Sequence, residues 1–182
     1  ELDKPLSLSD LISIISVMFF AGIETSVNLF GQSILHFLRN PDQARFWREN
    51  DYVTSRAVDE LVRFISPAQL TTRVLTEDIE IRGCLLRKGE IVMGSMAAAN
   101  RDPDVFENPD DFEFFREKNP HMGFGYGMHF CLGARLAKEE MGISIPALLR
   151  KFPEMKLHPE RNYQWDTIVV NRGLKELPVL LT

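Results

Sequence analysis

A glycine-rich loop that leads one cysteine to the start of a helix constrains this sequence more than any other feature. The loop reads FGYGMHFCLG from Phe124 to Gly133, and the helical stretch ARLAKEE follows directly. Gly125 and Gly127 permit backbone angles that other residues resist, and they leave room for a flat ligand against the main chain. Unpaired N–H groups and the positive end of the helix dipole favour the thiolate form of Cys131. The segment therefore predicts a sulfur ligand, whereas a cysteine taken alone is often a small buried side chain.

The loop resembles the haem-binding loop of the cytochrome P450 family. It fits the pattern F-x-x-G-x-x-x-C-x-G and has a histidine two residues before the cysteine, as in many bacterial members. The resemblance implies a haem b cofactor (iron protoporphyrin IX) whose iron is bound by Cys131, because a thiolate is a strongly donating axial ligand. Within the loop over 120–133, the haem-binding residues that it implies are Phe124, Gly125, His129, Cys131 and Gly133.

Two basic side chains are candidates for the haem propionates. The resemblance implies that Arg73, on an expected strand, binds one propionate and that His129 binds the other. Arginine suits a carboxylate because its planar fork donates to both oxygens. A surface arginine and a structural histidine are the alternatives. His129 and Cys131 could also suggest zinc, but the sequence has no second ligand pair at short spacing.

Composition limits the class of protein. The chain has 182 residues, of which 45% are hydrophobic and 26% charged, which is typical of globular proteins. Its net charge of −5 gives no reason to expect a nucleic-acid partner. If Cys131 binds iron, Cys84 has no disulfide partner, which favours a reducing, cytoplasmic location. The apolar stretch Leu11–Ile23 is too short to span a bilayer and ends at Glu24, so we expect no membrane segment.

The helical and strand patterns predict a mainly α fold with small β-sheets (α+β). Ser7 or Ser9 can cap a long central helix over 7–39, whose first half is apolar nearly all round and so requires burial on every side. A domain of this size hardly provides that burial, and members of the family are about twice as long. We therefore expect one unit over 1–182, the C-terminal haem-binding half of the cytochrome P450 fold, with the N-terminal half absent.

The other elements follow from turn and capping signals. We expect a helix over 54–65 and a helix over 134–150, in which Pro146 should bend the axis or break the hydrogen-bond ladder. The remaining expectations are a short helix after Asn40, another at 97–100, a long loop over 101–120, strands at 71–75, 79–82 and 90–93, and strands near 155–157, 167–170 and 178–181.

Glu60 and Arg63 form an E-x-x-R motif on one of these helices. Three-residue spacing places both side chains on one face, where they can pair. On any helix such a pair is commonly solvated and contributes little. The resemblance instead implies a structural pair that braces the haem-side core, with a third polar partner in a P-x-R-F setting. Here Asp111 occupies the arginine position of that pattern, which leaves the third partner open.

The segment AGIETS places Gly22, Glu24 and Thr25 in the middle of the long helix. A glycine there costs about 1 kcal/mol relative to alanine, so it needs a reason. One interpretation is a helix-packing glycine and a threonine that bonds its own backbone four residues earlier. The resemblance implies that Gly22 admits haem or dioxygen, that Thr25 hydrogen-bonds the bound dioxygen, and that Glu24 feeds protons.

The resemblance implies a haem-thiolate monooxygenase. Such an enzyme inserts one atom of dioxygen into a C–H bond of a small or lipophilic organic substrate, with electrons from a ferredoxin or flavodoxin-type donor and its reductase. The implied pocket residues, which are equally plain core or loop positions, are Ala68, Gln69, Leu70, Thr71, Val170 and Asn171. One alternative is a peroxide-driven enzyme, against which the intact Glu24–Thr25 pair argues. The other is a non-catalytic haem-binding or assembly module.

Overall fold

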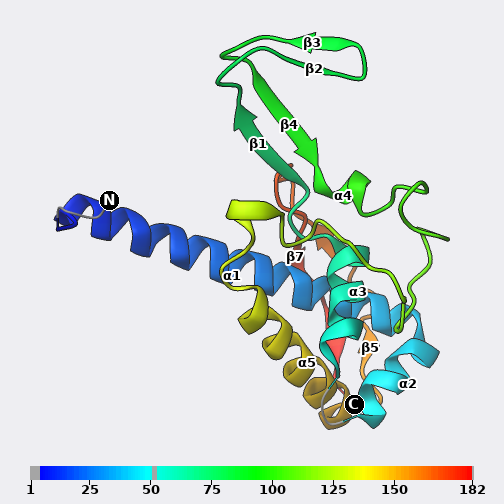
Figure 1. The fold of residues 1–182 in the computed structure, drawn as a ribbon. Helices are drawn as coiled ribbons and strands as arrows, with labels where there is room; N and C mark the ends of the chain where they lie inside the picture. The colour runs from blue at the N-terminus through cyan, green and yellow to red at the C-terminus, as the bar shows by residue number, and fades with distance from the viewer. Residues whose placement is uncertain (1–4, 51–52, 182) are drawn as a thin grey trace.

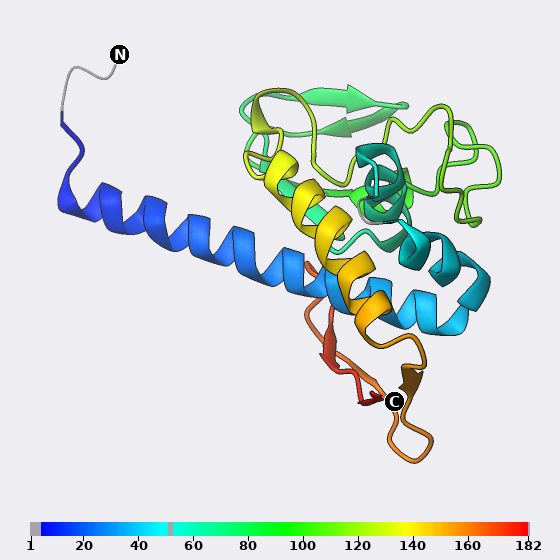
Figure 2. The same cartoon turned by 90° about the horizontal axis from the view of Figure 1, so that it is seen from below.

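One long helix, α1 (Leu8–Arg39), crosses the molecule and carries the other elements on its C-terminal half (Figures 1 and 2). The structure is a computed structural model that describes residues 5–50 and 53–181. The Ser7 hydroxyl accepts the Asp10 N–H at 3.2 Å, and the Asp10 carboxylate accepts the Ser7 N–H at 2.9 Å. This capping box satisfies two amides that a helix start leaves without partners. Ser7, not Ser9, is therefore the cap.

The described elements confirm a mainly α fold with small antiparallel sheets. The other helices are α2 (Pro41–Glu49), α3 (Ser55–Ile65), α4 (Met96–Ala99) and α5 (Ala134–Lys151), and a 3-10 turn spans Gly127–His129. The strand pairs are β1 (Leu70–Val74) with β4 (Ile91–Ser95), β2 (Ile79–Ile81) with β3 (Cys84–Leu86), β5 (Lys156–Leu157) with β8 (Val179–Leu180), and β6 (Gln164–Trp165) with β7 (Leu174–Glu176).

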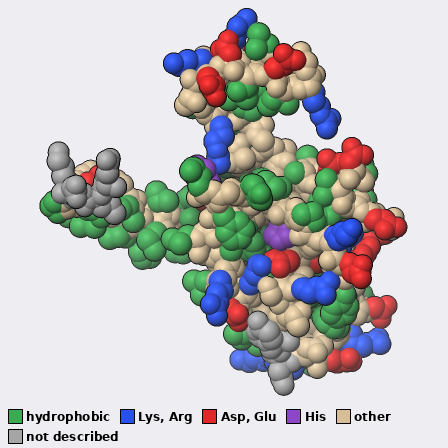
Figure 3. Space-filling model, in the orientation of Figure 1, with side chains coloured by type: hydrophobic (Ala, Val, Ile, Leu, Met, Phe, Trp, Pro, Cys, Tyr) green, Lys and Arg blue, Asp and Glu red, His purple; other side chains and the backbone are tan. Residues whose placement is uncertain are grey.

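The core lies where α2, α3 and α5 meet the C-terminal half of α1. Phe37, Trp47, Leu61 and Ile145 are almost fully buried there. The N-terminal half of α1 is different, because its apolar side chains are exposed along its whole surface (Figure 3). By length and composition alone, α1 is also long and apolar enough to cross a membrane. This was not predicted from the sequence, because only the uninterrupted apolar stretch Leu11–Ile23 was considered. The burial that this helix requires is therefore not provided by the described residues.

Helix α5 continues through Pro146, and its hydrogen-bond ladder is broken there, which is one of the two outcomes that the sequence predicted. Proline has no N–H, so the carbonyl of Gly142, four residues earlier, loses its helical donor. The N–H of Val53, in the connection between α2 and α3, donates to that carbonyl at 3.1 Å. Val53 and Pro146 are both buried. A partner from outside the helix thus satisfies the free acceptor, and the helix stays whole.

Several strand predictions were wrong. Strands β3, β6 and β7 were missed, although the Arg82–Gly83 turn before β3 was expected and has the positive φ angles of 50° and 79° that a tight hairpin uses. The strand predicted at 167–170 is irregular, and Val169 is 73% exposed. Its β-branched residues suggest a strand, but the pairing partners here are β6 and β7 on either side of it. Strand propensity alone does not supply a partner.

Candidate functional site

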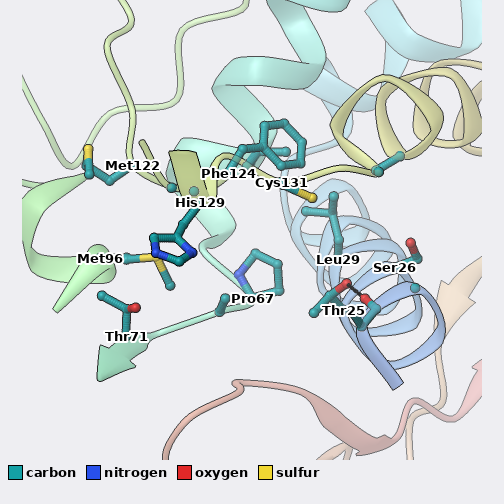
Figure 4. A pocket seen from close by; sticks show the side chains of 18 of the residues that line it. Thr25, Ser26, Leu29, Pro67, Thr71, Met96, Met122, Phe124, His129 and Cys131 are labelled. Atoms are coloured by element: carbon teal, nitrogen blue, oxygen red, sulfur yellow. Dashed lines mark hydrogen bonds between the residues drawn. The ribbon is translucent and has the colours of Figure 1, made fainter. Parts of the chain in front are cut away.

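A cavity of about 420 Å³ lies between α1, strand β1, the cysteine loop and the start of α5. Figure 4 shows Thr25 and Leu29 of α1 on one side of this cavity and Thr71, Met96 and His129 on the other. The residues proposed from the sequence that line it are Gly22, Thr25, Ala68, Thr71, Arg73, Phe124, Gly125, His129, Cys131 and Gly133. Segments far apart in the sequence therefore meet at one hollow.

The cysteine loop folds back on itself before the cavity. Gly125 and Gly127 have φ angles of 71° and 66°, which residues with side chains rarely adopt. These turns bring the Cys131 N–H to the Phe124 carbonyl, which accepts it at 2.8 Å. Cys131 lies in the turn just before α5 and is exposed to the cavity. Its exposure excludes the interpretation of Cys131 as a small buried side chain.

Arg73 and His129 reach the cavity from different elements. The Arg73 guanidinium donates to the Thr71 hydroxyl at 2.9 Å and to the Thr72 carbonyl at 2.8 Å, which holds it along strand β1. His129 ends the 3-10 turn that precedes the cysteine. These two side chains can each donate hydrogen bonds to an anionic ligand in the cavity. Both side chains line the cavity.

On α1 the three predicted residues differ in their environment. Nothing lies within 4 Å of the position that a Cβ on Gly22 would take, so this glycine does not serve close helix packing in the described structure. The Thr25 hydroxyl donates to the Ala21 carbonyl at 2.7 Å, the local bond that is the alternative to a ligand contact. Glu24 is half-buried but does not line the cavity.

Glu60 and Arg63 form a fully buried pair on α3. The guanidinium donates to both carboxylate oxygens of Glu60, at 2.7 and 2.8 Å, and both side chains are 0% exposed. Its remaining N–H groups donate to the carbonyls of Asn100, Pro109 and Asp111. The interpretation as a solvated surface pair is therefore wrong.

The third partner of the pair is Arg116, which sequence reasoning missed. Its Nε lies 3.2 Å from both oxygens of Glu60. Asp111 takes part through its backbone carbonyl, which accepts from Arg63 and from Arg116. Arg116 is the only arginine between Arg101 and Arg135 in the sequence, so it could have been identified as the candidate third partner.

The expected pocket segments lie beside each other. Ala68 pairs with Asn171 in an isolated bridge, and the Gln69 N–H donates to the Val170 carbonyl at 2.8 Å. Ala68 lines the cavity, whereas the side chains of Gln69, Leu70, Val170 and Asn171 do not. The predicted segments therefore lie next to the cavity, but most of their residues do not line it.

A family model described as cytochrome P450 matches residues 1–172. The chain belongs to the cytochrome P450 family. The biotin biosynthesis cytochrome P450 of Bacillus subtilis is 42% identical over 98% of this chain and 45% of its own length. CYP109E1 from Bacillus megaterium, solved with testosterone, matches with a TM-score of 0.91 and 31% identity, over 100% of this chain and 51% of that one.

A second solved structure is P450BioI in complex with acyl carrier protein ligated to hexadec-9Z-enoic acid. It matches with a TM-score of 0.81 and 44% identity, over 89% of this chain and 42% of that one. The chain thus spans about half the length of the cytochrome P450 proteins that it matches.

The cytochrome P450 family implies a haem cofactor, and the cavity residues fit one. They supply one thiol and two donors for carboxylates, and no side chain blocks the faces of Gly22 and Gly133. The sequence did not single out Leu29, Met96, Met122, Leu136 and Glu140, which also line the cavity. Four of these are simply apolar, and no sequence signal marks any of the five. Across 5–50 and 53–181, no group of three or more His, Cys, Asp or Glu residues could hold a metal ion.

Proposed function

We propose that this chain is the haem-binding half of a haem-thiolate monooxygenase. The observation that carries the proposal is the exposure of Cys131 to the cavity, at the end of a self-bonded loop, in a hollow that Gly22 and Thr25 of α1 also line. Haem b, when bound, supplies the activation of dioxygen by which one oxygen atom enters a substrate C–H bond and the other leaves as water. The sulfur of Cys131 would bind the haem iron, and a thiolate is the strongly donating ligand that this chemistry uses.

The other residues of the site bind and deliver protons. Arg73 and His129 would donate to the propionates of a bound haem, and Phe124, Gly125 and Gly133 would lie against it. The Thr25 hydroxyl, which donates to the Ala21 carbonyl, would donate instead to dioxygen held in the cavity. Glu24, half-buried one residue earlier on α1, supplies protons from solvent to that hydroxyl.

The substrate is a small lipophilic molecule. The side chains around the cavity are mostly apolar, and two solved relatives hold testosterone and a hexadecenoic acid on its carrier protein. Electrons come from a ferredoxin or flavodoxin-type protein with its reductase. We assign the enzyme to the cytoplasm.

The exposed half of α1 belongs, in this proposal, inside the complete fold and not in a membrane. CYP109E1 aligns with the whole chain and is about twice as long, so an additional half of that kind is the natural cover for the apolar side chains. That half also closes the substrate pocket. Recovery of the full-length protein in the supernatant without detergent is the expected result, whereas recovery only from membranes would contradict it.

Spectroscopy and turnover together test the function. Carbon monoxide added to the reduced protein should give the red-shifted band of thiolate ligation, and Cys131→Ala should abolish that band while Cys84→Ala leaves it unchanged. NADPH with a surrogate reductase should then convert a lipophilic substrate. A thiolate band in Cys131→Ala would refute the ligand. Haem binding without turnover in any reductase or peroxide assay would favour the non-catalytic module.

A further inference from the structure

Three charged or titratable side chains meet beside the cysteine loop, away from the cavity. His121 Nε2 lies 3.1 Å from Asp59 Oδ1, and Lys138 Nζ lies 2.6 Å from the same oxygen. The three residues come from the start of the loop, from α3 and from α5. The His121 side chain is 7% exposed, and those of Asp59 and Lys138 are 22% and 24% exposed. A charged group that is largely withdrawn from water is stabilised by its partners and fixes their geometry.

The two ring nitrogens of His121 have different partners. Nδ1 accepts the N–H of Gly123 at 3.2 Å, so the proton of the neutral ring lies on Nε2, which donates to Asp59. One side chain thus connects the backbone of the loop to α3.

Close packing reinforces this connection at the next residues. A Cβ on Gly123 would lie 2.5 Å from the Val62 side chain, so only glycine lets the loop approach α3 this closely. Phe124 follows, with its ring 5.7 Å from that of His121 and the Lys138 ammonium 5.5 Å from its centroid. The loop is therefore fixed against α3 and α5 over His121, Gly123 and Phe124.

The position of Phe124 determines the position of Cys131 through a backbone hydrogen bond. The Phe124 carbonyl accepts the Cys131 N–H, which closes the loop at its far end. We propose that Asp59, His121 and Lys138 are positioning residues that hold this loop so that Cys131 faces the cavity. The part of the inference that concerns haem rests on the proposed function, whereas the part that concerns loop position does not.

The pKa of Asp59 agrees with this role. Burial alone would raise it, but the hydrogen bonds and charges of His121 and Lys138 outweigh burial and lower it. Asp59 is therefore an anion that both neighbours stabilise. An amide at this position would keep the shape but lose the charge that Lys138 requires.

Paired variants of His121 separate its two bonds. His121→Gln keeps a donor near the Nε2 position and can reach Asp59, whereas His121→Asn keeps an acceptor near Nδ1 but is too short for Asp59. The measurement is hydrogen–deuterium exchange over 121–131 in the full-length protein as purified, with haem content recorded. We expect exchange about tenfold faster in Asp59→Asn and His121→Asn, and near-parental exchange in His121→Gln and Lys138→Arg. Asp42→Asn, in an exposed pair on α2, is the control and should change nothing.

The second measurement is the share of bound haem that shows the thiolate band with carbon monoxide. This share should fall in Asp59→Asn and His121→Asn at unchanged global unfolding midpoint, a pattern that general destabilisation does not produce. Equal exchange in the two His121 variants, or an unchanged thiolate share in both damaging variants, overturns the proposal. If the parent protein binds no haem, the proposed function fails, and the exchange comparison still decides the positioning role.

Discussion

Replacing Glu60 by alanine should cost more stability than any other single change to the E-x-x-R cluster. Its carboxylate accepts from Arg63, Arg116, Asn119 and the Glu113 backbone N–H, and it is completely buried. Breaking one buried ion pair costs about 3–5 kcal/mol, because the remaining charge has no partner. Arg63 loses its counter-charge here and Arg116 loses the buried one of its two carboxylate partners, so we expect a loss of about 5 kcal/mol. A typical domain has a net stability of only about 5–15 kcal/mol, so Glu60→Ala should be poorly folded and lack haem.

Glu113 provides a matched control on the same arginine. The Glu113 carboxylate lies 3.4 Å from Arg116 Nη2, but the Glu113 side chain is 44% exposed. We expect Glu113→Ala to cost about 0–1 kcal/mol, as solvated pairs do. Urea unfolding followed by circular dichroism, with haem content measured on the same samples, compares the two variants. Similar losses for both, or a Glu60→Ala protein that folds and holds haem but turns over slowly, would refute the bracing role.

Three further outcomes follow from the site and the core. Thr25→Ala should keep haem and substrate binding but form less product per NADPH consumed, with peroxide released instead; Thr25→Ser should restore coupling, and added peroxide should bypass part of the defect. Unchanged coupling in the alanine variant would remove this hydroxyl from the mechanism. Arg73→Ala should weaken haem retention roughly tenfold, because a charge-assisted bond is lost, whereas Arg87→Ala, whose partner is Asp78, should not. Burial lowers the pKa of His36, so the folded state binds its proton less readily than the unfolded state. The unfolding free energy should therefore fall as the pH drops below 6.5, and His36→Gln should reduce this dependence in urea titrations at several pH values.

Features encoded in contiguous residues were predictable from the sequence. The helix start, which the sequence narrowed to a cap at Ser7 or Ser9, the helix that bears Glu60 and the glycine turns of the cysteine loop each depend on neighbours within a few positions. The family and the fold class followed from these local motifs and are confirmed. The roles of Thr25 and of the haem-binding residues stay predictions.

Features that depend on distant partners were not predictable. Arg116 reaches Glu60 only because the long loop folds back over α3. The strand expected at 167–170 failed for the same reason, since pairing is decided by which backbone lies alongside and not by β-branched residues. His121 could not be connected to Asp59 from the sequence, because nothing local indicates that the loop packs on α3.

The proline in α5 has a consequence for how that helix is aligned. The Gly142 carbonyl, which Pro146 leaves without a helical donor, accepts the Val53 N–H. Apolar packing tolerates a helix that slides or rotates slightly, but a single directional bond does not. A shift of α5 by one residue would leave the buried Val53 amide without an acceptor. The Gly142 carbonyl that Pro146 frees therefore fixes the position of α5 along its axis. The hydrogen–deuterium exchange rate of the Val53 amide should report whether α5 packs in this position.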